Sequence, residues 1–439
     1  MSFKRRGLTA VALGACLVLV PLHTGSAQPS AQKSPQRELV EITAVDAQQR
    51  TRVADTGVDV LGVDGDRMTV VAEPNHRSLL TATGLPTRSL GDANAELAAL
   101  GKVQFADPKP GEVGARDFPS GYTGYHNYAE MVAELRQTVT DHPTLVTLRS
   151  IGKSYEGRDQ WAIKLSDNPS VDEAEPEVLF TCNQHAREHL TVEMCLHIIK
   201  RYTDGYATNP TIKSLVDSRE IWIVPSVNPD GAEYDIAAGT LRAWRKNRQP
   251  NSTSVGTDPN RNWGYKWGCC GGSSGSGSSE TYRGTAAFSA PETRNIRDFV
   301  GSRVVGGVQQ IKANIDWHTY SELILWPYGY TYSDTDTGLN ATQASVFSTL
   351  GRRMAALNGY TPQQASDLYI TDGAVDDWMW GTHKIWSYTF EMYPSSGGGT
   401  SGFYPRDTVI AAQTARNDSA VELFLGYADC PPRIISSTC

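Results

Sequence analysis

The chain has 439 residues, of which 39% are hydrophobic and 20% are charged, and its formal net charge is -8 at pH 7. This length is too great for one small domain and suits a large domain with accessory segments. The acidic balance argues against nucleic acid or an anionic membrane surface as the main partner, so we expect neither.

The first residues follow the pattern of a secretion signal. The charged start Lys4–Arg6 precedes an apolar stretch at 8–22, and small residues at 25–27 offer a cleavage site. The apolar stretch is short for a membrane span. Arg5-Arg6 also fits a twin-arginine signal, although we favour the general export route. We therefore predict a signal peptide at 1–27 and a secreted, extracellular protein.

Residues 28–116 differ in pattern from the rest of the chain. Short β-like runs at 58–61 and 67–71 accompany a modest helical stretch near 92–100, and Pro108–Gly111 is typical of a linker. We predict a small α+β propeptide that an activating protease releases after Arg116. A permanent N-terminal domain is the alternative, and N-terminal sequencing of the secreted protein separates the two.

Residues 117–428 alternate between apolar runs and helical patterns. This alternation predicts an α/β domain with a mostly parallel mixed central sheet and helices on both faces, followed by a tail at 429–439. Ser289 and Glu292 have capping-box spacing and open one of the helices. The expected helices are 127–141, 191–202, 289–300, 344–357 and 409–427, and the expected strands 146–148, 160–164, 177–182, 220–224, 312–316 and 385–390.

The run His185-Ala-Arg-Glu-His189 is the most informative stretch for chemistry. It follows the predicted strand 177–182, so His185 and Glu188 lie past the carboxyl end of a strand, where open α/β sheets build their sites. Two such ligands need one more for an open catalytic zinc site. His318 ends another predicted strand and is the best candidate. Alone, each of these residues would be read as an ordinary loop or strand-end side chain.

Two further groups are needed for hydrolysis, a base and a cation. Glu391 ends the predicted strand 385–390, where a carboxylate could take a proton from a metal-activated water and pass it to a leaving amine. Arginines at 187, 245 and 261 lie in or near these loops, and buried guanidinium groups bind carboxylates and stabilise oxyanions. A solvated charge run remains the plain interpretation of Lys246 and Arg248.

Export to an oxidising compartment favours disulfides for the remaining cysteines. Cys182 and Cys195 flank the His185 loop, and a bridge between them would stiffen it. Cys430 and Cys439 would close the tail. The adjacent Cys269 and Cys270 have no partner that the sequence identifies.

Taken together, these residues and several further motifs resemble the zinc metallocarboxypeptidases of the carboxypeptidase A/B family. Within that family, the chain is most similar to the secreted bacterial carboxypeptidase T-like enzymes. The motifs occur in family order across about 117–428. The matching segments are His185–Glu188, Asn228–Gly231, Trp244–Lys246, Asp258–Trp263, His318–Tyr320, Trp326–Tyr330, Tyr369–Trp378 and Thr389–Glu391.

The resemblance implies a role for each matching residue. One Zn²⁺ ion would be held by His185, Glu188 and His318, with Asp258 behind His185. Glu391 would be the general base and acid, and Arg245 would steady the scissile carbonyl oxygen. The substrate's terminal carboxylate would be bound by Asn260, Arg261 and Tyr369. The cleft further out would be lined by Arg187, Tyr320 and Phe403.

Specificity depends on Asp376, which falls where B-type enzymes carry a pocket aspartate. A buried carboxylate there would pair with lysine or arginine, while Leu325, Gly329 and Thr389 would keep the pocket apolar and open. We therefore expect release of basic and also apolar C-terminal residues. The alternative is that Asp376 turns outward and the preference is A-like.

The sequence thus predicts an exopeptidase zymogen that acts as a monomer on peptide or protein C-termini. A zinc amide deacylase acting on small N-acyl substrates is the alternative, because related folds reuse the same ligand set. A non-catalytic binding module would require a missing ligand or base, and none is missing.

Overall fold

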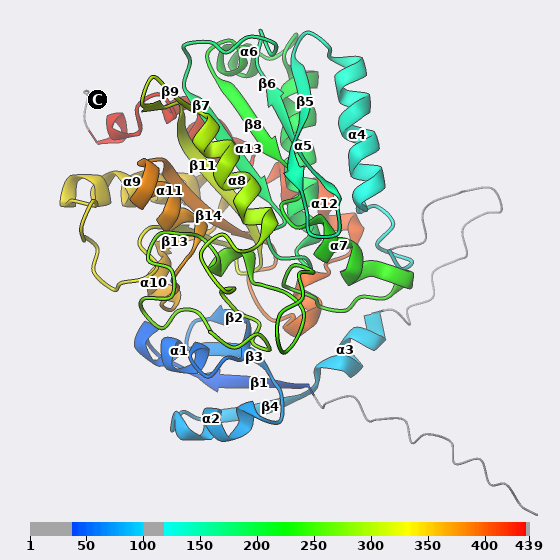
Figure 1. The fold of residues 1–439 in the computed structure, drawn as a ribbon, viewed down its shortest axis with the longest axis vertical. Helices are drawn as coiled ribbons and strands as arrows, with labels where there is room; N and C mark the ends of the chain where they lie inside the picture. The colour runs from blue at the N-terminus through cyan, green and yellow to red at the C-terminus, as the bar shows by residue number, and fades with distance from the viewer. Residues whose placement is uncertain (1–36, 101–117, 436–439) are drawn as a thin grey trace, which may run out of the picture. The chain divides into compact units, whose positions relative to one another are not determined.

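The structure is a computed structural model that describes residues 37–100 and 118–435 (Figure 1). The predicted signal peptide and the predicted cleavage position at Arg116 lie outside the described residues. So does Cys439, the partner expected for Cys430. Within the described part of the chain, no helix is long and apolar enough to cross a membrane.

Residues 37–100, which we call the N-terminal region, form an antiparallel sheet with strand order β2-β3-β1-β4. Alternate residues of β1 and β3 turn inward and meet Val53 and Leu80 of the helices, which gives this region its own core. The α+β fold expected here is confirmed. Its elements are β1 Glu38–Thr43, α1 Ala47–Ala54, β2 Asp59–Asp64, β3 Arg67–Ala72, α2 His76–Ala82, β4 Thr87–Asp92 and α3 Ala93–Leu100.

Residues 118–435, the main domain, are built on an eight-stranded sheet with order β13-β12-β14-β11-β7-β8-β6-β5. The central pairs β14/β11, β11/β7 and β7/β8 are parallel, whereas β12/β14, β8/β6 and β6/β5 are antiparallel. The predicted mixed sheet is therefore confirmed. Its strands are β5 Val146–Lys153, β6 Asp159–Leu165, β7 Glu177–Cys182, β8 Glu220–Val224, β11 Ile311–Thr319, β12 Leu323–Trp326, β13 Thr361–Gln364 and β14 Trp386–Met392.

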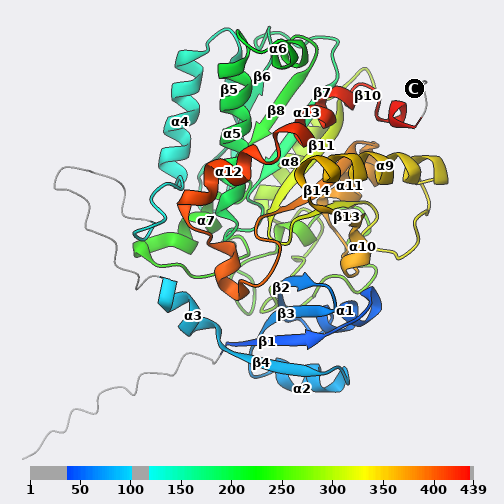
Figure 2. The same ribbon diagram turned by 180° about the vertical axis from the view of Figure 1, so that it is seen from behind.

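Both faces of this sheet are buried, which explains why its central strands are continuously apolar. In β7, Val178 and Phe180 join one core while Leu179 joins the core on the opposite face. Helices α8 and α11 cover one face, and α5, α9 and α13 lie on the other (Figures 1 and 2). The helices are α4 Tyr128–Asp141, α5 His189–Gly205, α6 Pro210–Val216, α7 Pro229–Ile236, α8 Pro291–Ser302, α9 Ala341–Asn358, α10 Ala365–Leu368, α11 Val375–His383, α12 Ile410–Ala415 and α13 Asp418–Tyr427, with a small hairpin of β9 Val304–Val305 and β10 Val308–Gln309.

Two helix predictions were wrong in detail. Helix α8 begins at Pro291 with Ala290 as its N-cap residue, so it has no side-chain cap. Glu292 turns inward and accepts hydrogen bonds from the Tyr155 amide (3.0 Å) and the Asn247 side chain (2.7 Å). The helix predicted at 409–427 is broken into α12 and α13. At the break, Arg416 forms an ion pair with Glu322 (2.6 Å), so a tertiary contact fixes the interruption.

Candidate active site

The loop after β7 brings His185 and Glu188 to the carboxyl end of the sheet. Asn183 has φ 59°, a left-handed conformation that asparagine tolerates, and its side-chain nitrogen donates to the His185 carbonyl (3.1 Å). The Thr191 hydroxyl donates to the Glu188 carbonyl (2.6 Å). The expected Cys182–Cys195 bridge is formed and ties the end of β7 to α5. The loop is therefore fixed at both ends.

His318 and Glu391 lie opposite each other on neighbouring parallel strands. The register of β11 and β14 pairs His318 with Glu391. Strand β11 continues to Thr319, so His318 belongs to the strand rather than following it, as the shorter predicted strand implied. Because paired residues on adjacent strands point to the same side, both side chains are delivered to one place.

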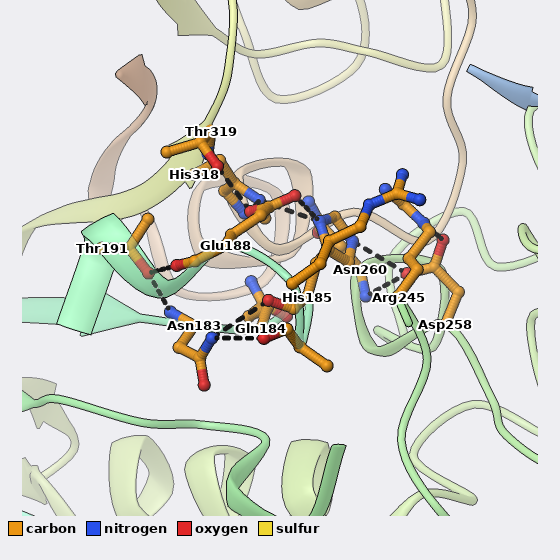
Figure 3. Close-up of polar contacts among 12 residues, drawn as sticks. Asn183, Gln184, His185, Glu188, Thr191, Arg245, Asp258, Asn260, His318 and Thr319 are labelled. Atoms are coloured by element: carbon orange, nitrogen blue, oxygen red, sulfur yellow. Dashed lines mark hydrogen bonds and ion pairs between the residues drawn. The ribbon is translucent and has the colours of Figure 1, made fainter. Parts of the chain in front are cut away.

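The side chains of His185, Glu188 and His318 converge at the carboxyl end of the sheet (Figure 3). His185 Nδ1 lies 2.8 Å from Glu188 Oε1, and His318 Nδ1 lies 2.9 Å from Glu188 Oε2 and 3.1 Å from His185 Nδ1. All three side chains are buried, and their ligand atoms lie within 4.8 Å of one another, close enough to share a metal ion.

Each of the two histidines also contacts an aspartate through its other ring nitrogen, Nε2. Asp258 Oδ1 lies 3.1 Å from His185 Nε2, and Asp316 Oδ2 lies 2.5 Å from His318 Nε2. Such contacts fix the ring orientation and place a proton on Nε2, which leaves Nδ1 with its lone pair. Asp258 was predicted, whereas Asp316 was missed. Its signal was the two-residue spacing before His318, which puts both side chains on one face of a strand.

The donor set fits a zinc ion. Two imidazole nitrogens with their lone pairs turned inward and a carboxylate are the ligands of an open catalytic zinc site. Without a cation, two Nδ1 atoms 3.1 Å apart would face each other beside a buried carboxylate. Burial alone would raise the pKa of Glu188, but the neighbouring His185 and His318 hold it well below its usual range. The three donor atoms therefore suit a bound cation.

Glu391 lines the same cleft as His185 and Glu188. Burial raises the pKa of the Glu391 carboxyl to about 8, with His318 and Arg245 opposing the rise and Glu188 adding to it. A carboxylate with a raised pKa accepts a proton more readily than a surface glutamate does. The position and environment therefore suit a proton carrier.

Arg245, Asn260 and Arg261 border the cleft on the side of Asp258. Arg245 is held by Asp258 through Nε (3.2 Å) and Nη2 (2.9 Å). Asn260 Oδ1 accepts from the Val375 amide (2.9 Å). Arg261 donates from Nε to the Gly272 carbonyl (2.8 Å) and from Nη1 to the Asn260 carbonyl (2.7 Å). All three side chains are thus oriented by their own neighbours before any substrate arrives.

The outer part of the cleft is aromatic. Tyr320 and Phe403 meet edge to face with ring centroids 5.0 Å apart, and the Arg187 guanidinium lies 4.0 Å from the Phe403 ring centre. Tyr369 lines the cleft and packs against the core of the N-terminal region. Tyr320, Phe403 and Tyr369 line the cleft, whereas Arg187 is not among its lining residues and meets it only through Phe403.

Asp376 lies in the first turn of α11, is buried and lines the cleft, so it does not turn outward. Burial raises its pKa to about 6. Leu325 and Thr389 line the cleft beside it. Gly329, in contrast, donates its amide to Asp377 (2.9 Å) and packs against Thr371. Of the four residues predicted for the specificity pocket, Asp376, Leu325 and Thr389 line the cleft and Gly329 does not.

The N-terminal region occupies the entrance of this cleft. Asp59 binds the Arg187 guanidinium through two hydrogen bonds (2.5 and 2.8 Å), and residues 60–63 of β2 line the cleft. Gly62 lies against the Tyr320 ring, where a Cβ atom would be 3.0 Å from the nearest carbon. The cavity left in the cleft measures about 80 Å³, well below the roughly 300 Å³ of a small ligand site. No local sequence pattern indicates a role for Asp59.

His189 does not compete as a ligand. Its Nε2 lies 2.9 Å from Asp235 Oδ2, and Asp235 also accepts from the Trp244 amide (2.7 Å) and the Tyr404 hydroxyl. Because Trp244 precedes Arg245, this buried group supports the segment that carries the arginine.

Comparisons with known proteins agree with this geometry. A family model described as zinc carboxypeptidase matches residues 131–418. The chain is 72% identical over 440 residues to a zinc carboxypeptidase from Saccharothrix mutabilis subsp. capreolus, with 100% of both chains covered. It is 31% identical over 314 residues to carboxypeptidase B from Rattus norvegicus, which covers 70% of this chain and 71% of that protein.

Among solved structures, carboxypeptidase A from Helicoverpa armigera matches in fold, with a TM-score of 0.70 at 23% identity over 90% of this chain and 98% of that chain. The resemblance seen in the sequence is thus confirmed, and the chain belongs to the zinc carboxypeptidase family.

Proposed function

We propose that this chain is a secreted zymogen of a zinc exopeptidase that removes basic and also apolar residues from peptide C-termini. The proposal includes residues 28–116 as an inhibitory propeptide, residues 117–428 as the catalytic domain and one zinc ion held by His185, Glu188 and His318. The observation that carries it is that Arg261 and Glu391 border one cleft with His185 and Glu188, which His318 joins to complete the ligand set.

The chain's own side chains divide the reaction between them. When bound, zinc would supply Lewis-acid chemistry at the cleft. Glu391 takes a proton from the attacking water and passes it to the leaving amine. Arg245, held by Asp258, donates hydrogen bonds to the scissile carbonyl oxygen as it gains negative charge.

Selectivity for the last peptide bond follows from a fixed spacing. Arg261 and Asn260, with Tyr369, bind the terminal carboxylate, and all three border the same cleft as Glu391 and Arg245. Only a peptide bond one residue from a free carboxylate then reaches Glu391, which is catalysis by positioning.

The test is a C-terminal ladder assay on a mixed peptide set, using protein cut after Arg116. We expect stepwise loss of C-terminal residues, abolition by a chelator and recovery on adding one equivalent of zinc. Peptides with amidated C-termini are the control and should be cleaved far more slowly. Internal cleavage, or hydrolysis of small N-acyl substrates but not peptides, would overturn the proposal and favour an endopeptidase or a deacylase.

Asp376 is expected to recognise basic side chains. Asp376→Ala should lower kcat/KM for hippuryl-arginine by about 10- to 100-fold, the cost of losing a hydrogen-bonded charge pair. Hippuryl-phenylalanine is the internal control and should be hydrolysed at nearly the original rate. An unchanged ratio between the two substrates would remove Asp376 from the specificity pocket.

Asp59 is expected to hold the uncut chain inactive. Asp59→Ala leaves Arg187 buried without its partner, so the N-terminal region should bind less tightly and the activity of uncut protein should rise about 10-fold or more. Asp64→Ala is a matched control, because its ion pair with Arg67 is exposed (51% and 52%) and should contribute little. Equal activity of both uncut variants would contradict this role.

A further inference from the structure

An adjacent disulfide lies beside the carboxylate-binding arginine. Cys269 and Cys270 are bonded to each other, which resolves the pairing that the sequence left open. Both residues are exposed, whereas Cys182 and Cys195 are fully buried. The bridge lies outside the metal site, and the mechanism described above does not use it.

Hydrogen bonds run from this bridge to Arg261 and to the loop behind Tyr369. The Cys270 amide donates to Asp372 Oδ2 (2.7 Å). Two residues later, the Gly272 carbonyl accepts from Arg261 Nε (2.8 Å). On the other side of Arg261, the Trp263 amide donates to the Gly373 carbonyl (3.0 Å). Three chain segments, 261–263, 270–272 and 371–373, are thus bonded to one another.

Close packing reinforces these bonds. A Cβ atom on Gly272 would lie 2.4–2.5 Å from backbone atoms of Thr371 and Asp372, so only glycine allows this approach. A Cβ atom on Gly373 would lie 2.6 Å from the Arg261 carbonyl oxygen. The position of Arg261 therefore depends on how the 269–272 segment lies against the loop that follows Tyr369.

We propose that the Cys269–Cys270 bridge, with Gly272 and Asp372, positions Arg261 and so sets the affinity of the cleft for the substrate's terminal carboxylate. This inference rests on the proposed function. Two nitrogens of Arg261 are held by carbonyls, and among the hydrogen bonds of the described residues Nη2 takes no part, which leaves it for the carboxylate. Losing the bridge would free the Gly272 carbonyl to move and would misalign Nη2.

The test compares the double variant Cys269→Ser/Cys270→Ser with the wild type. Both proteins are produced as the full chain and then cut after Arg116. KM for a peptide with a free carboxylate should rise about 3- to 10-fold, the effect of one neutral hydrogen bond, while kcat changes little. The preference for free-acid over amidated peptides should fall by the same factor. A fall in kcat at constant KM would indicate a merely structural role and overturn the inference.

Two further measurements keep the test decisive if the double variant does not fold. Asp372→Ala should raise KM in the same way, and Asp372→Asn should restore it, because asparagine still offers an oxygen to the Cys270 amide. Treating folded wild type with a dithiol should also raise KM, as the dithiol closes to a disulfide and the Cys269–Cys270 bond opens to two thiols. Alkylation and mass spectrometry would verify that only these two thiols appear.

The outcomes separate this inference from the function on which it rests. Wild-type protein that does not shorten free-acid peptides would overturn the proposed function. Wild-type protein that does so, with KM unchanged in the variants and after reduction, would overturn only the role of the bridge.

Discussion

Glu391→Gln is expected to lower kcat of the cut enzyme by about 10²- to 10⁴-fold, the usual contribution of a positioned general base. Glutamine has nearly the same shape as glutamate but cannot accept the proton of the attacking water. The metal ligands are untouched, and Glu391 faces them from the neighbouring strand β14. Zinc content should therefore stay at one ion per chain, and the loss should appear in kcat more than in KM.

The measurement is steady-state kinetics on a blocked dipeptide, together with metal analysis of the same samples. Glu134→Gln is the matched control, because Glu134 is exposed on α4 and the same chemical change there should leave kcat unaltered. Retained turnover in Glu391→Gln with full zinc would remove Glu391 as the base. Loss of zinc would instead assign Glu391 to the binding of the metal.

Arg261→Ala is expected to lower kcat/KM for free-acid peptides by about 100-fold or more. The variant loses charge-assisted hydrogen bonds to the terminal carboxylate, each contributing about 1.5–3 kcal/mol. Because the same contact places the scissile bond, the preference for the C-terminal bond should weaken as well. Arg261→Lys should recover only part of the loss, since an ammonium cannot bind a carboxylate bidentately.

Competition between free-acid and amidated peptides measures this effect directly. Arg294→Ala is a suitable control, because Arg294 is exposed on α8 and should not affect either substrate. If Arg261→Ala hydrolyses free-acid peptides at the original rate, the carboxylate must be bound elsewhere in the cleft.

Sequence patterns predicted the structure best where one strand or helix carries the whole signal. Strands β7 and β8 have the predicted bounds, because a short run buried on both faces has a strong signature. Of the site residues named from motifs, all but Arg187 and His318 line one cleft, which other residues, among them 60–63, also line.

What the sequence did not reveal depends on contacts between distant segments. Asp59 meets Arg187 across 128 positions of the chain, and no local pattern indicates such a pair. Ser289 does not cap α8, whose N-cap residue is Ala290, and its hydroxyl instead accepts a hydrogen bond from the Asn262 side chain (3.0 Å). Helix α7 and strand β13 were missed as well, since short elements with polar residues carry little periodic signal.

The pairing of His318 with Glu391 on β11 and β14 has a consequence for how such enzymes change over time. Their separation is set by the distance between hydrogen-bonded strands, about 4.8 Å, and not by the length of any loop. The segments that carry Asp376 and Phe403 lie outside these strands, so they can be exchanged or lengthened while the reacting groups keep their spacing. Diversification of substrate range, in nature or in directed evolution, can proceed on those segments and leave the hydrolytic centre intact.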